Sequence, residues 1–91
     1  MPNWRYPSFD WDDGNTEHIL ERHNVYQDEV EAVFRNNGHV YRKGNRYIAI
    51  GRDDSGQLLF IVCEIRASKV RPISARLANE AERRLYERHR R

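Results

Sequence analysis

Residues 46–65 read RYIAIGRDDSGQLLFIVCEI, and this stretch decides the fold. Residues 46–52 alternate between two faces, with Arg52 on the same face as the isoleucines, which is the two-residue period of a strand. Residues 57–65 are apolar on both faces, as expected of a central strand that is covered on both sides. Between them, residues 53–56 (DDSG) favour a tight turn. The stretch therefore predicts a β-hairpin within a sheet.

Further elements are expected on either side of this hairpin. They are strands at residues 6–11, 39–42 and 69–74 and helices at residues 16–23, 27–36 and 78–90. Asn15 is expected to cap the first helix and Asn24 to end it. In the last helix, Ala78, Ala81 and Leu85 form the expected buried stripe. The order β-α-α-β-β-β-α, which counts four of these five candidate strands, predicts an α+β domain with helices packed on an antiparallel sheet.

Length and composition indicate one small domain spanning residues 1–91. Hydrophobic residues make up 38% and charged residues 33%, a mixture too apolar for a disordered chain and too polar for a membrane protein. The N-terminus lacks the apolar segment of a secretory signal, and the single cysteine, Cys63, excludes an internal disulfide. We therefore expect a cytoplasmic protein with a small core, whose site is a shallow groove or an exposed face.

Charge is distributed unevenly along the chain. Residues 1–34 hold eight acidic and two basic residues, a net of −6, whereas residues 35–91 hold fourteen basic and six acidic residues, a net of +8. Fourteen of the sixteen basic residues are arginine, whose planar fork of donors matches phosphate and carboxylate groups. The second part of the chain is therefore suited to binding a polyanion such as RNA, although an arginine-rich composition also arises from genomic bias.

Four arginines stand out because they fall at or just beyond the ends of expected strands. They are Arg52, Arg66, Arg71 and Arg76. In the expected hairpin, Arg52 lies near the turn and Arg66 at the opposite end, where Arg71 follows after the next turn. A cationic sheet face or rim of this kind binds phosphates and stabilises charge that develops on one. The alternative is a set of solvated arginines at strand ends.

Two other side chains are candidates for proton transfer or substrate orientation. His23 closes the first helix next to Arg22, and histidine suits general acid or base work in phosphodiester cleavage. The alternative is a helix-end histidine stabilised by the helix dipole. Tyr86 lies beside the buried stripe of the last helix, where it either orients a base or phosphate or contributes only to packing.

No metal site or cofactor is expected from the sequence. His18 and His23 are five residues apart and do not share a helix face as an i,i+4 pair would. There is no Gly-rich phosphate loop and no nucleophile motif, and Cys63 falls in the most apolar strand, where it is expected to be inert.

Six local patterns occur together and in order along the chain. They are FDWD at 9–12, NTEHILERHNV at 15–25, EVEAVF at 29–34, YIAIGR at 47–52, VRPISAR at 70–76 and ERRLYE at 82–87. With these patterns the chain resembles the BrnT toxin family, within the RelE/ParE-like toxin superfamily. The likeness spans nearly the whole chain, and its most specific part is the Ser74-Ala75-Arg76 segment followed by a helix with Glu82 and Tyr86.

The resemblance implies a type II toxin–antitoxin role for a small cytoplasmic ribonuclease. Such toxins are neutralised by a cognate antitoxin that also binds DNA, with which they form hetero-oligomers. Superfamily toxins cleave RNA without metal, using basic, histidine and tyrosine side chains to position the 2′-hydroxyl and stabilise the charged phosphate. The matching catalytic positions here are His23, Arg52, Arg66, Arg76 and Tyr86. Arg22, Lys69 and Arg71 are the expected RNA-binding residues.

The chain also departs from the family pattern. Asn24 stands where the family usually has glycine, and asparagine also tolerates the left-handed conformation. Tyr26 stands where many relatives have a serine or threonine cap, and Gln57 where many have an arginine before the central strand. The loss of that arginine leaves a second hypothesis open, namely a non-catalytic module that binds RNA or a protein partner without cleaving.

Overall fold

The computed structural model of the protein describes residues 3–90 and contains three helices and four strands. The elements in chain order are α1 (Asp13–His23), α2 (Gln27–Arg35), β1 (His39–Lys43), β2 (Arg46–Arg52), β3 (Leu58–Arg66), β4 (Lys69–Leu77) and α3 (Glu80–His89). Each of the three helices and four of the five expected strands lies where the sequence predicts it, within a few residues. Among residues 3–90 no helix has the length and apolar character needed to cross a membrane.

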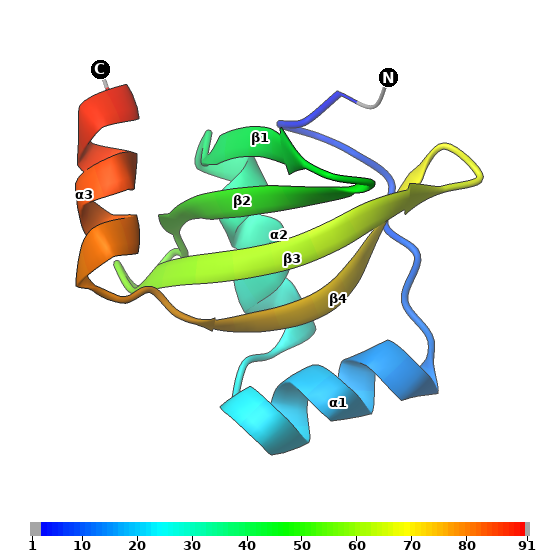
Figure 1. Ribbon diagram of the computed structural model, residues 1–91. Helices are drawn as coiled ribbons and strands as arrows, with labels where there is room; N and C mark the ends of the chain where they lie inside the picture. The colour runs from blue at the N-terminus through cyan, green and yellow to red at the C-terminus, as the bar shows by residue number, and fades with distance from the viewer. Residues whose placement is uncertain (1–2, 91) are drawn as a thin grey trace.

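The strands form one antiparallel sheet in the order β1-β2-β3-β4, so each strand pairs with its neighbour in sequence (Figure 1). In the register of β2 and β3, Arg52 lies opposite Leu58, and in that of β3 and β4, Arg66 lies opposite Lys69. The predicted α+β class and the antiparallel sheet are thus confirmed. The same register puts Arg52 and Arg66 at opposite ends of the sheet.

The turn between β2 and β3 is held by the side chain of Asp53, which is only 4% exposed. Its Oδ1 accepts hydrogen bonds from the backbone N–H of Ser55 at 2.9 Å, the Ser55 hydroxyl at 2.8 Å and the backbone N–H of Gln57 at 3.0 Å. This is the self-bonding that makes aspartate a turn residue. Gly56 follows with φ +92°, a conformation that favours glycine. The turn therefore fixes where β2 ends and β3 begins.

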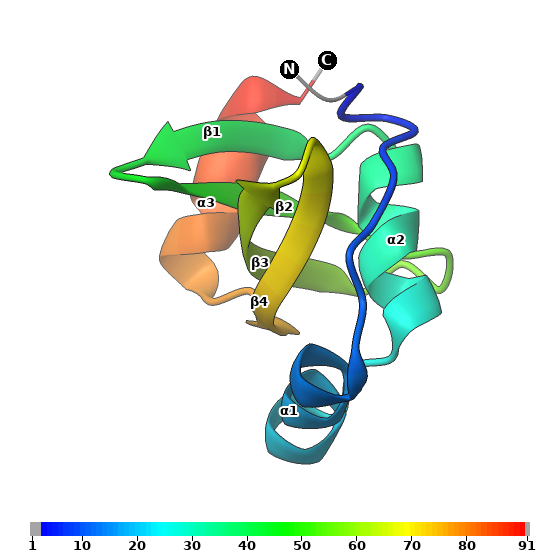
Figure 2. The same cartoon turned by 90° about the vertical axis from the view of Figure 1, so that its right-hand side faces the viewer.

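Helices cover both faces of the sheet (Figures 1 and 2). α1 and α2 pack on one face, where Ile19, Val33 and Phe34 join Leu59 and Ile61 in the larger core. α3 packs on the other face over a smaller core. That core consists of Ile48, Ile50, Leu58 and Tyr86. Because both faces of β3 are covered, its side chains are apolar in both directions, as its sequence predicts.

The N-terminal segment does not form the strand expected at residues 6–11. It makes one isolated parallel bridge, Phe9 to Val70, in which Val70 N donates to Ser8 O and Asp10 N donates to Val70 O, each at 2.9 Å. The pairing stops there because the chain turns at once into α1, which is capped by Asp12. The observed order is therefore α-α-β-β-β-β-α, with this segment alongside the edge strand β4.

α1 begins three residues earlier than expected, and Asn15 has a different role from the predicted cap. Asp12 is the N-cap and accepts from Asn15 N, while the Asn15 side chain accepts from Asp12 N, which completes a capping box. The Asn15 amide also donates to Asp10 O and Pro72 O, both at 3.0 Å. At its other end α1 stops at Asn24, in the left-handed conformation with φ 56°, as predicted.

The buried stripe of α3 also differs from the expected one. Ala81 is exposed, and Tyr86 is the buried residue of this helix, with 9% of its surface exposed. Leu85 and Ala78 pack at the side of the same small core, as predicted. The difference arises because α3 contacts the sheet through its second half, where a large aromatic ring covers more apolar area than alanine does.

Replacing Asn15 with alanine should lower the free energy of unfolding by about 2–3 kcal/mol, because it removes a buried capping-box partner and two donors to backbone carbonyls. Asn79 provides the matched control, since it holds the equivalent bond to Glu82 N at the exposed start of α3. Asn79→Ala should cost about 1 kcal/mol. Urea denaturation of both variants measures the difference, and equal losses would contradict a special role for Asn15.

Candidate active site

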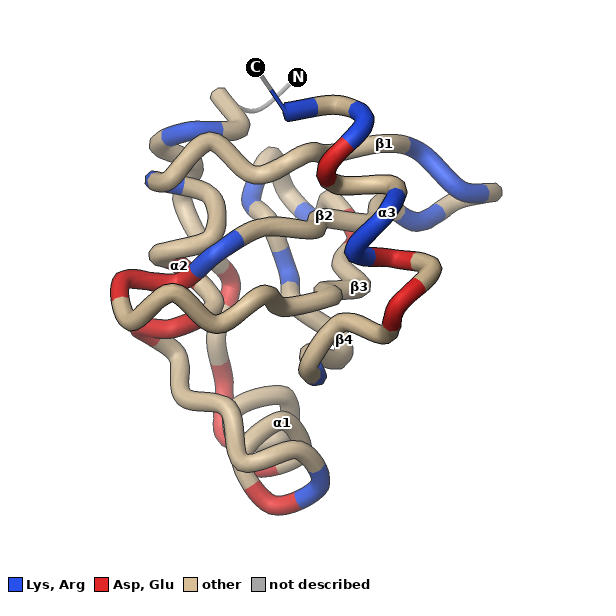
Figure 3. Tube along the Cα trace, turned by 90° about the vertical axis from the view of Figure 1, so that its left-hand side faces the viewer, with Lys and Arg blue, Asp and Glu red and all other residues tan. Residues whose placement is uncertain are grey.

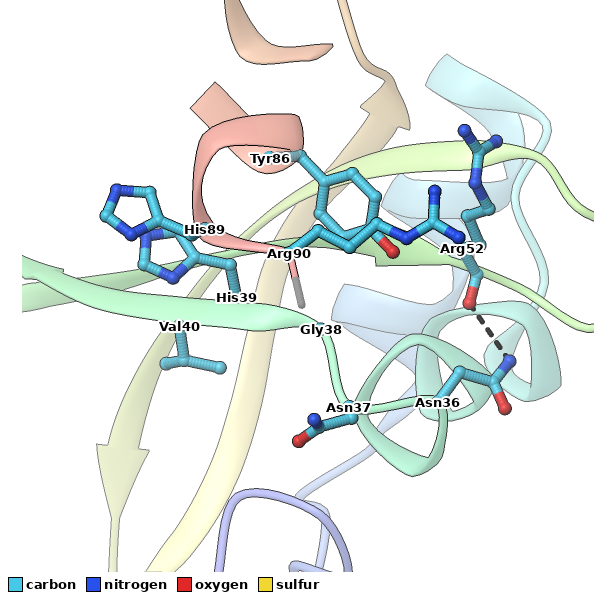
Figure 4. Close-up of a pocket in the computed structure, with 9 residues that line it drawn as sticks. All are labelled: Asn36, Asn37, Gly38, His39, Val40, Arg52, Tyr86, His89 and Arg90. Atoms are coloured by element: carbon cyan, nitrogen blue, oxygen red, sulfur yellow. Dashed lines mark hydrogen bonds between the residues drawn. The ribbon is translucent and has the colours of Figure 1, made fainter. Parts of the chain in front are cut away.

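An open pocket of about 530 Å³ lies where the end of β2, the start of β1 and the end of α3 meet (Figure 4). Its lining residues are Asn36, Asn37, Gly38, His39, Val40, Arg52, Tyr86, His89 and Arg90. Two of the predicted site residues, Arg52 and Tyr86, are among them. The lining contains two arginines and two histidines but no carboxylate. The pocket is therefore suited to an anionic ligand.

Two glycines let the backbone come close enough to form this pocket. A Cβ added to Gly51 would lie 2.8 Å from the Gly38 Cα, a distance that real Cβ atoms do not tolerate. This close approach brings the end of α2 against the end of β2, where the Asn36 amide donates to Arg52 O at 3.0 Å. The backbone of Arg52 is thus fixed from two sides, by the sheet and by Asn36.

The Arg52 side chain extends from the end of β2 toward α3. Its Nη1 donates to Gly56 O at 2.8 Å, and its guanidinium carbon lies 5.9 Å from the centre of the Tyr86 ring, within cation–π range. Its Nη2 is 3.7 Å from Glu87 Oε1, and Arg90 Nη1 is 3.9 Å from Glu87 Oε2. Both ion pairs are long and partly exposed, so an incoming phosphate can replace Glu87 at either arginine.

Two histidines that the sequence analysis did not select form another part of the pocket wall. The rings of His39 and His89 stack with their centres 4.0 Å apart and an angle of 4° between their planes. The pKa of His39 is lowered, first by burial and second by the neighbouring His89. The two residues are fifty positions apart and share no motif, so only the folding of β1 against α3 reveals the pair.

Arg76 lies on the α3 side of the sheet, where it pairs in register with Phe60 on β3, and it does not line the pocket. Its guanidinium stacks over the Phe60 ring at 4.4 Å and binds both oxygens of Glu82, each at 2.8 Å. These bonds lower the pKa of Glu82 and raise that of Arg76. Arg76 therefore ties β4 to the start of α3, and most of its donors are already engaged.

Arg66, Lys69 and Arg71 lie at the opposite end of the sheet from the pocket. Arg71 Nη1 is 3.0 Å from Asp12 Oδ2 and 3.6 Å from Asp10 Oδ2, while Arg66 Nε is 4.0 Å from Asp10 Oδ2. The hydrogen bond with Arg71 is the largest cause of the lowered pKa of Asp12. The predicted placement of Arg52 and Arg66 at opposite ends of the hairpin is confirmed. The four strand-end arginines therefore do not form one cluster, because antiparallel pairing divides them between two ends of the sheet.

Arg22 and His23 lie in the last turn of α1 and are both exposed. The His23 ring contacts that of His18 at 6.1 Å in an edge-to-face arrangement. Neither residue lines the pocket. Of the five predicted catalytic residues, the fold brings Arg52 and Tyr86 together in the pocket. Arg76 lies on the same side of the sheet outside the pocket lining, and His23 and Arg66 lie elsewhere.

The uneven charge of the sequence becomes a spatial separation in the fold (Figure 3). Acidic residues gather around α1 and the foot of α2, whereas lysine and arginine dominate the β1–β2 hairpin and the last turns of α3. The pocket takes Arg52 from the end of β2 and Arg90 from the end of α3, and the acidic turn that begins at Asp53 directly follows Arg52.

Comparison with known proteins identifies the family. Residues 11–82 match the family model described as the ribonuclease toxin BrnT of a type II toxin–antitoxin system. The chain belongs to the BrnT family. It is therefore a ribonuclease toxin of a type II system, and an antitoxin is its partner.

A solved BrnT structure shares the fold. The crystal structure of the Brucella abortus ribonuclease toxin BrnT matches with a TM-score of 0.65 and 19% sequence identity, over 82% of this chain and 100% of that chain. A search of curated proteins found no match. The BrnT family model reaches Arg52, Arg76 and Glu82, and Tyr86, His89 and Arg90 lie beyond the matched residues.

The environment of Cys63 agrees with the prediction that this residue is inert. Cys63 is fully buried, and burial raises the pKa of its thiol to about 12, so it is not a nucleophile near neutral pH. Within residues 3–90 no three histidine, cysteine or carboxylate side chains gather as metal ligands.

Replacing Glu82 with glutamine should lower the free energy of unfolding at pH 7 by about 1–2 kcal/mol, allowing for the partly exposed Arg76. Because the folded pKa of Glu82 is depressed, its contribution is present above the ordinary value of 4.5 and is lost as pH falls through the folded pKa. The variant should therefore lose less stability than the wild type on acidification below pH 4.5.

Glu80 is the matched control for this measurement, since its pair with Arg84 is 3.9 Å long and well exposed. Glu80→Gln should change the unfolding free energy by less than about 0.5 kcal/mol at pH 7. Urea titrations at several pH values give both numbers. If Glu82→Gln had the same acid dependence as the wild type, the Arg76–Glu82 pair would not be a source of stability.

Proposed function

We propose that this BrnT-family toxin cleaves RNA without a metal ion, in the pocket bounded by Arg52, Tyr86 and Arg90. The observation that carries the proposal is the chemistry of the pocket lining, which offers two guanidinium groups, two imidazoles and a phenol but no carboxylate. Mg²⁺ requires oxygen ligands, chiefly carboxylates, whereas arginines stabilise phosphate charge directly. The pocket therefore suits a reaction in which the protein itself supplies the positive charge.

The proposed reaction is the attack of the ribose 2′-hydroxyl on the adjacent phosphorus. The 2′-oxygen loses its proton as it bonds to phosphorus, and the 5′-oxygen of the next nucleotide takes up a proton as its bond breaks. Arg52 stabilises the negative charge that builds on the non-bridging oxygens. Tyr86 supports this arrangement because its ring lies beside the Arg52 guanidinium, and its hydroxyl can both donate and accept a hydrogen bond.

The other predicted residues receive outer roles in this proposal. Arg76 is a positioning residue, because its bonds to Glu82 hold the start of the helix that carries Tyr86. Arg66, Lys69, Arg71, Arg22 and His23 contact only flanking parts of a longer RNA. Loss of one of them would then weaken binding in a salt-dependent manner without removing the chemical step.

Several finer properties follow from the resemblance and belong to the same proposal. We propose that residues 1–91 act as one RelE/ParE-like toxin domain in the cytoplasm. Its antitoxin binds DNA and forms a hetero-oligomer with the toxin. The cationic pocket is a suitable target for an acidic segment of such an antitoxin, because covering Arg52 and Arg90 would block the substrate phosphate.

Arg52→Ala should reduce the rate of RNA cleavage about 100- to 1,000-fold, because it removes the main stabiliser of the developing charge. Arg66→Ala is the matched control, since it removes an exposed arginine from the other end of the same sheet. Cleavage of a labelled RNA is measured with purified proteins in EDTA. Induced expression in cells should arrest growth with wild type and Arg66→Ala, and not with Arg52→Ala.

The proposed chemistry fails if EDTA abolishes cleavage or if Arg52→Ala cleaves as fast as Arg66→Ala. If the wild type binds RNA with a strong salt dependence and never cleaves it, the chain is the non-catalytic module that the sequence left open. Circular dichroism of each variant establishes that any loss of activity is not a loss of folding.

A further inference from the structure

Three aromatic rings form a column at the edge of the pocket. Tyr41 and His39 project from β1, with ring centres 5.4 Å apart and 28° between their planes. His89 from the last turn of α3 continues the column, 4.0 Å from His39 and almost parallel to it. In Figure 4 the His39 and His89 rings lie face to face on the opposite side of the view from Arg52.

Exposure increases outward along this column. Tyr41 and His39 are half-buried, whereas His89 is exposed, and within residues 3–90 His39 is the one ring stacked on it. One face of the His89 imidazole is therefore covered by His39 and the other is open to a ligand. A helix-end histidine that served only the helix dipole would need no ring partner on β1.

The column is also electrostatically suited to stacking on a neutral aromatic ligand. Burial and, second, the neighbouring His89 both lower the pKa of His39, which favours the uncharged form of the inner imidazole. Two like charges at stacking distance are thereby avoided. Arg52 and Arg90 line the same pocket as His39 and His89, and Glu87 pairs with both arginines. Glu82 is the charged group that acts on Tyr41 and helps to raise its pKa.

We propose that the open face of His89 binds one nucleobase of the RNA, so that the base becomes the fourth ring of the column. This inference rests on the proposed function and adds a base subsite to its phosphate site. The arrangement combines the two elements of single-strand recognition, an aromatic platform for a base and arginines for the backbone beside it. A base with an exposed π-face is required, so the substrate is unpaired at this nucleotide.

The test uses a short single-stranded RNA with 2′-O-methyl riboses, which binds without being cleaved. In a companion set, each base in turn is replaced by an abasic site. For the wild type, fluorescence anisotropy should show one position at which the abasic replacement weakens binding about tenfold, the usual range for one stacked base. His89→Ala should weaken binding of the intact RNA by a similar factor. For this variant, the abasic replacement at that one position should cause no further loss of affinity.

Two variants separate stacking from other roles of the histidine. His89→Phe keeps an aromatic ring without a titratable nitrogen, and it should bind the intact RNA within about twofold of the wild type, because stacking is retained. His18→Ala removes an exposed histidine from α1 and should bind as the wild type does.

The inference is overturned if His89→Ala binds the RNA as tightly as the wild type does. It is also overturned if every abasic replacement weakens binding to His89→Ala as much as it weakens binding to the wild type. A third contrary result would be that His89→Phe loses as much affinity as His89→Ala. In each case Arg52→Ala can still lose cleavage, and the proposed function then stands without this subsite. If the wild type itself binds no RNA, both proposals fail together.

Discussion

The carboxylate of Asp53 is buried within the turn that it closes, and much of the molecule depends on this arrangement. Three donors from Ser55 and Gln57 converge on one of its oxygens, so the turn has a fixed length. A fixed turn sets the register of β2 on β3, and a slip of one residue would move every side chain to the other face. The same turn presents the Gly56 carbonyl to Arg52, which orients the guanidinium toward α3.

Local sequence patterns were sufficient to predict the helices and strands, but they did not predict which side chains meet in the pocket. The alternation of residues 46–52 and the turn residues after them predicted the hairpin, because both signals act between near neighbours. The placement of Arg52 followed from that hairpin. The pairing of His39 with His89 left no sequence signal, because its two members meet only through packing between β1 and α3. Likewise, no local rule connects Arg71 with Asp12, which neutralises it across the sheet edge.

α3 links stability to function because one side of its second half contributes to both the core and the pocket. Tyr86 contributes to the small core under the helix and also borders the pocket. One turn later, His89 and Arg90 reach the pocket from the same helix end. The attachment of α3 at its start, through Arg76 and Glu82, therefore determines the geometry at its end. Sequence changes far from the pocket can act on it through this helix.

The charge of the molecule is unevenly distributed, with acidic residues concentrated around α1 and basic residues dominating the β1–β2 hairpin and the last turns of α3 (Figure 3). In the field of a polyanion such a molecule experiences a torque before any contact is made, so encounters begin with its basic side toward the polyanion. Orientation of this kind raises the association rate constant. The electrostatic interaction that causes it is screened beyond about 8 Å at physiological ionic strength. Ionic strength can thus regulate how often the toxin meets its substrate while leaving the bond-breaking step unchanged.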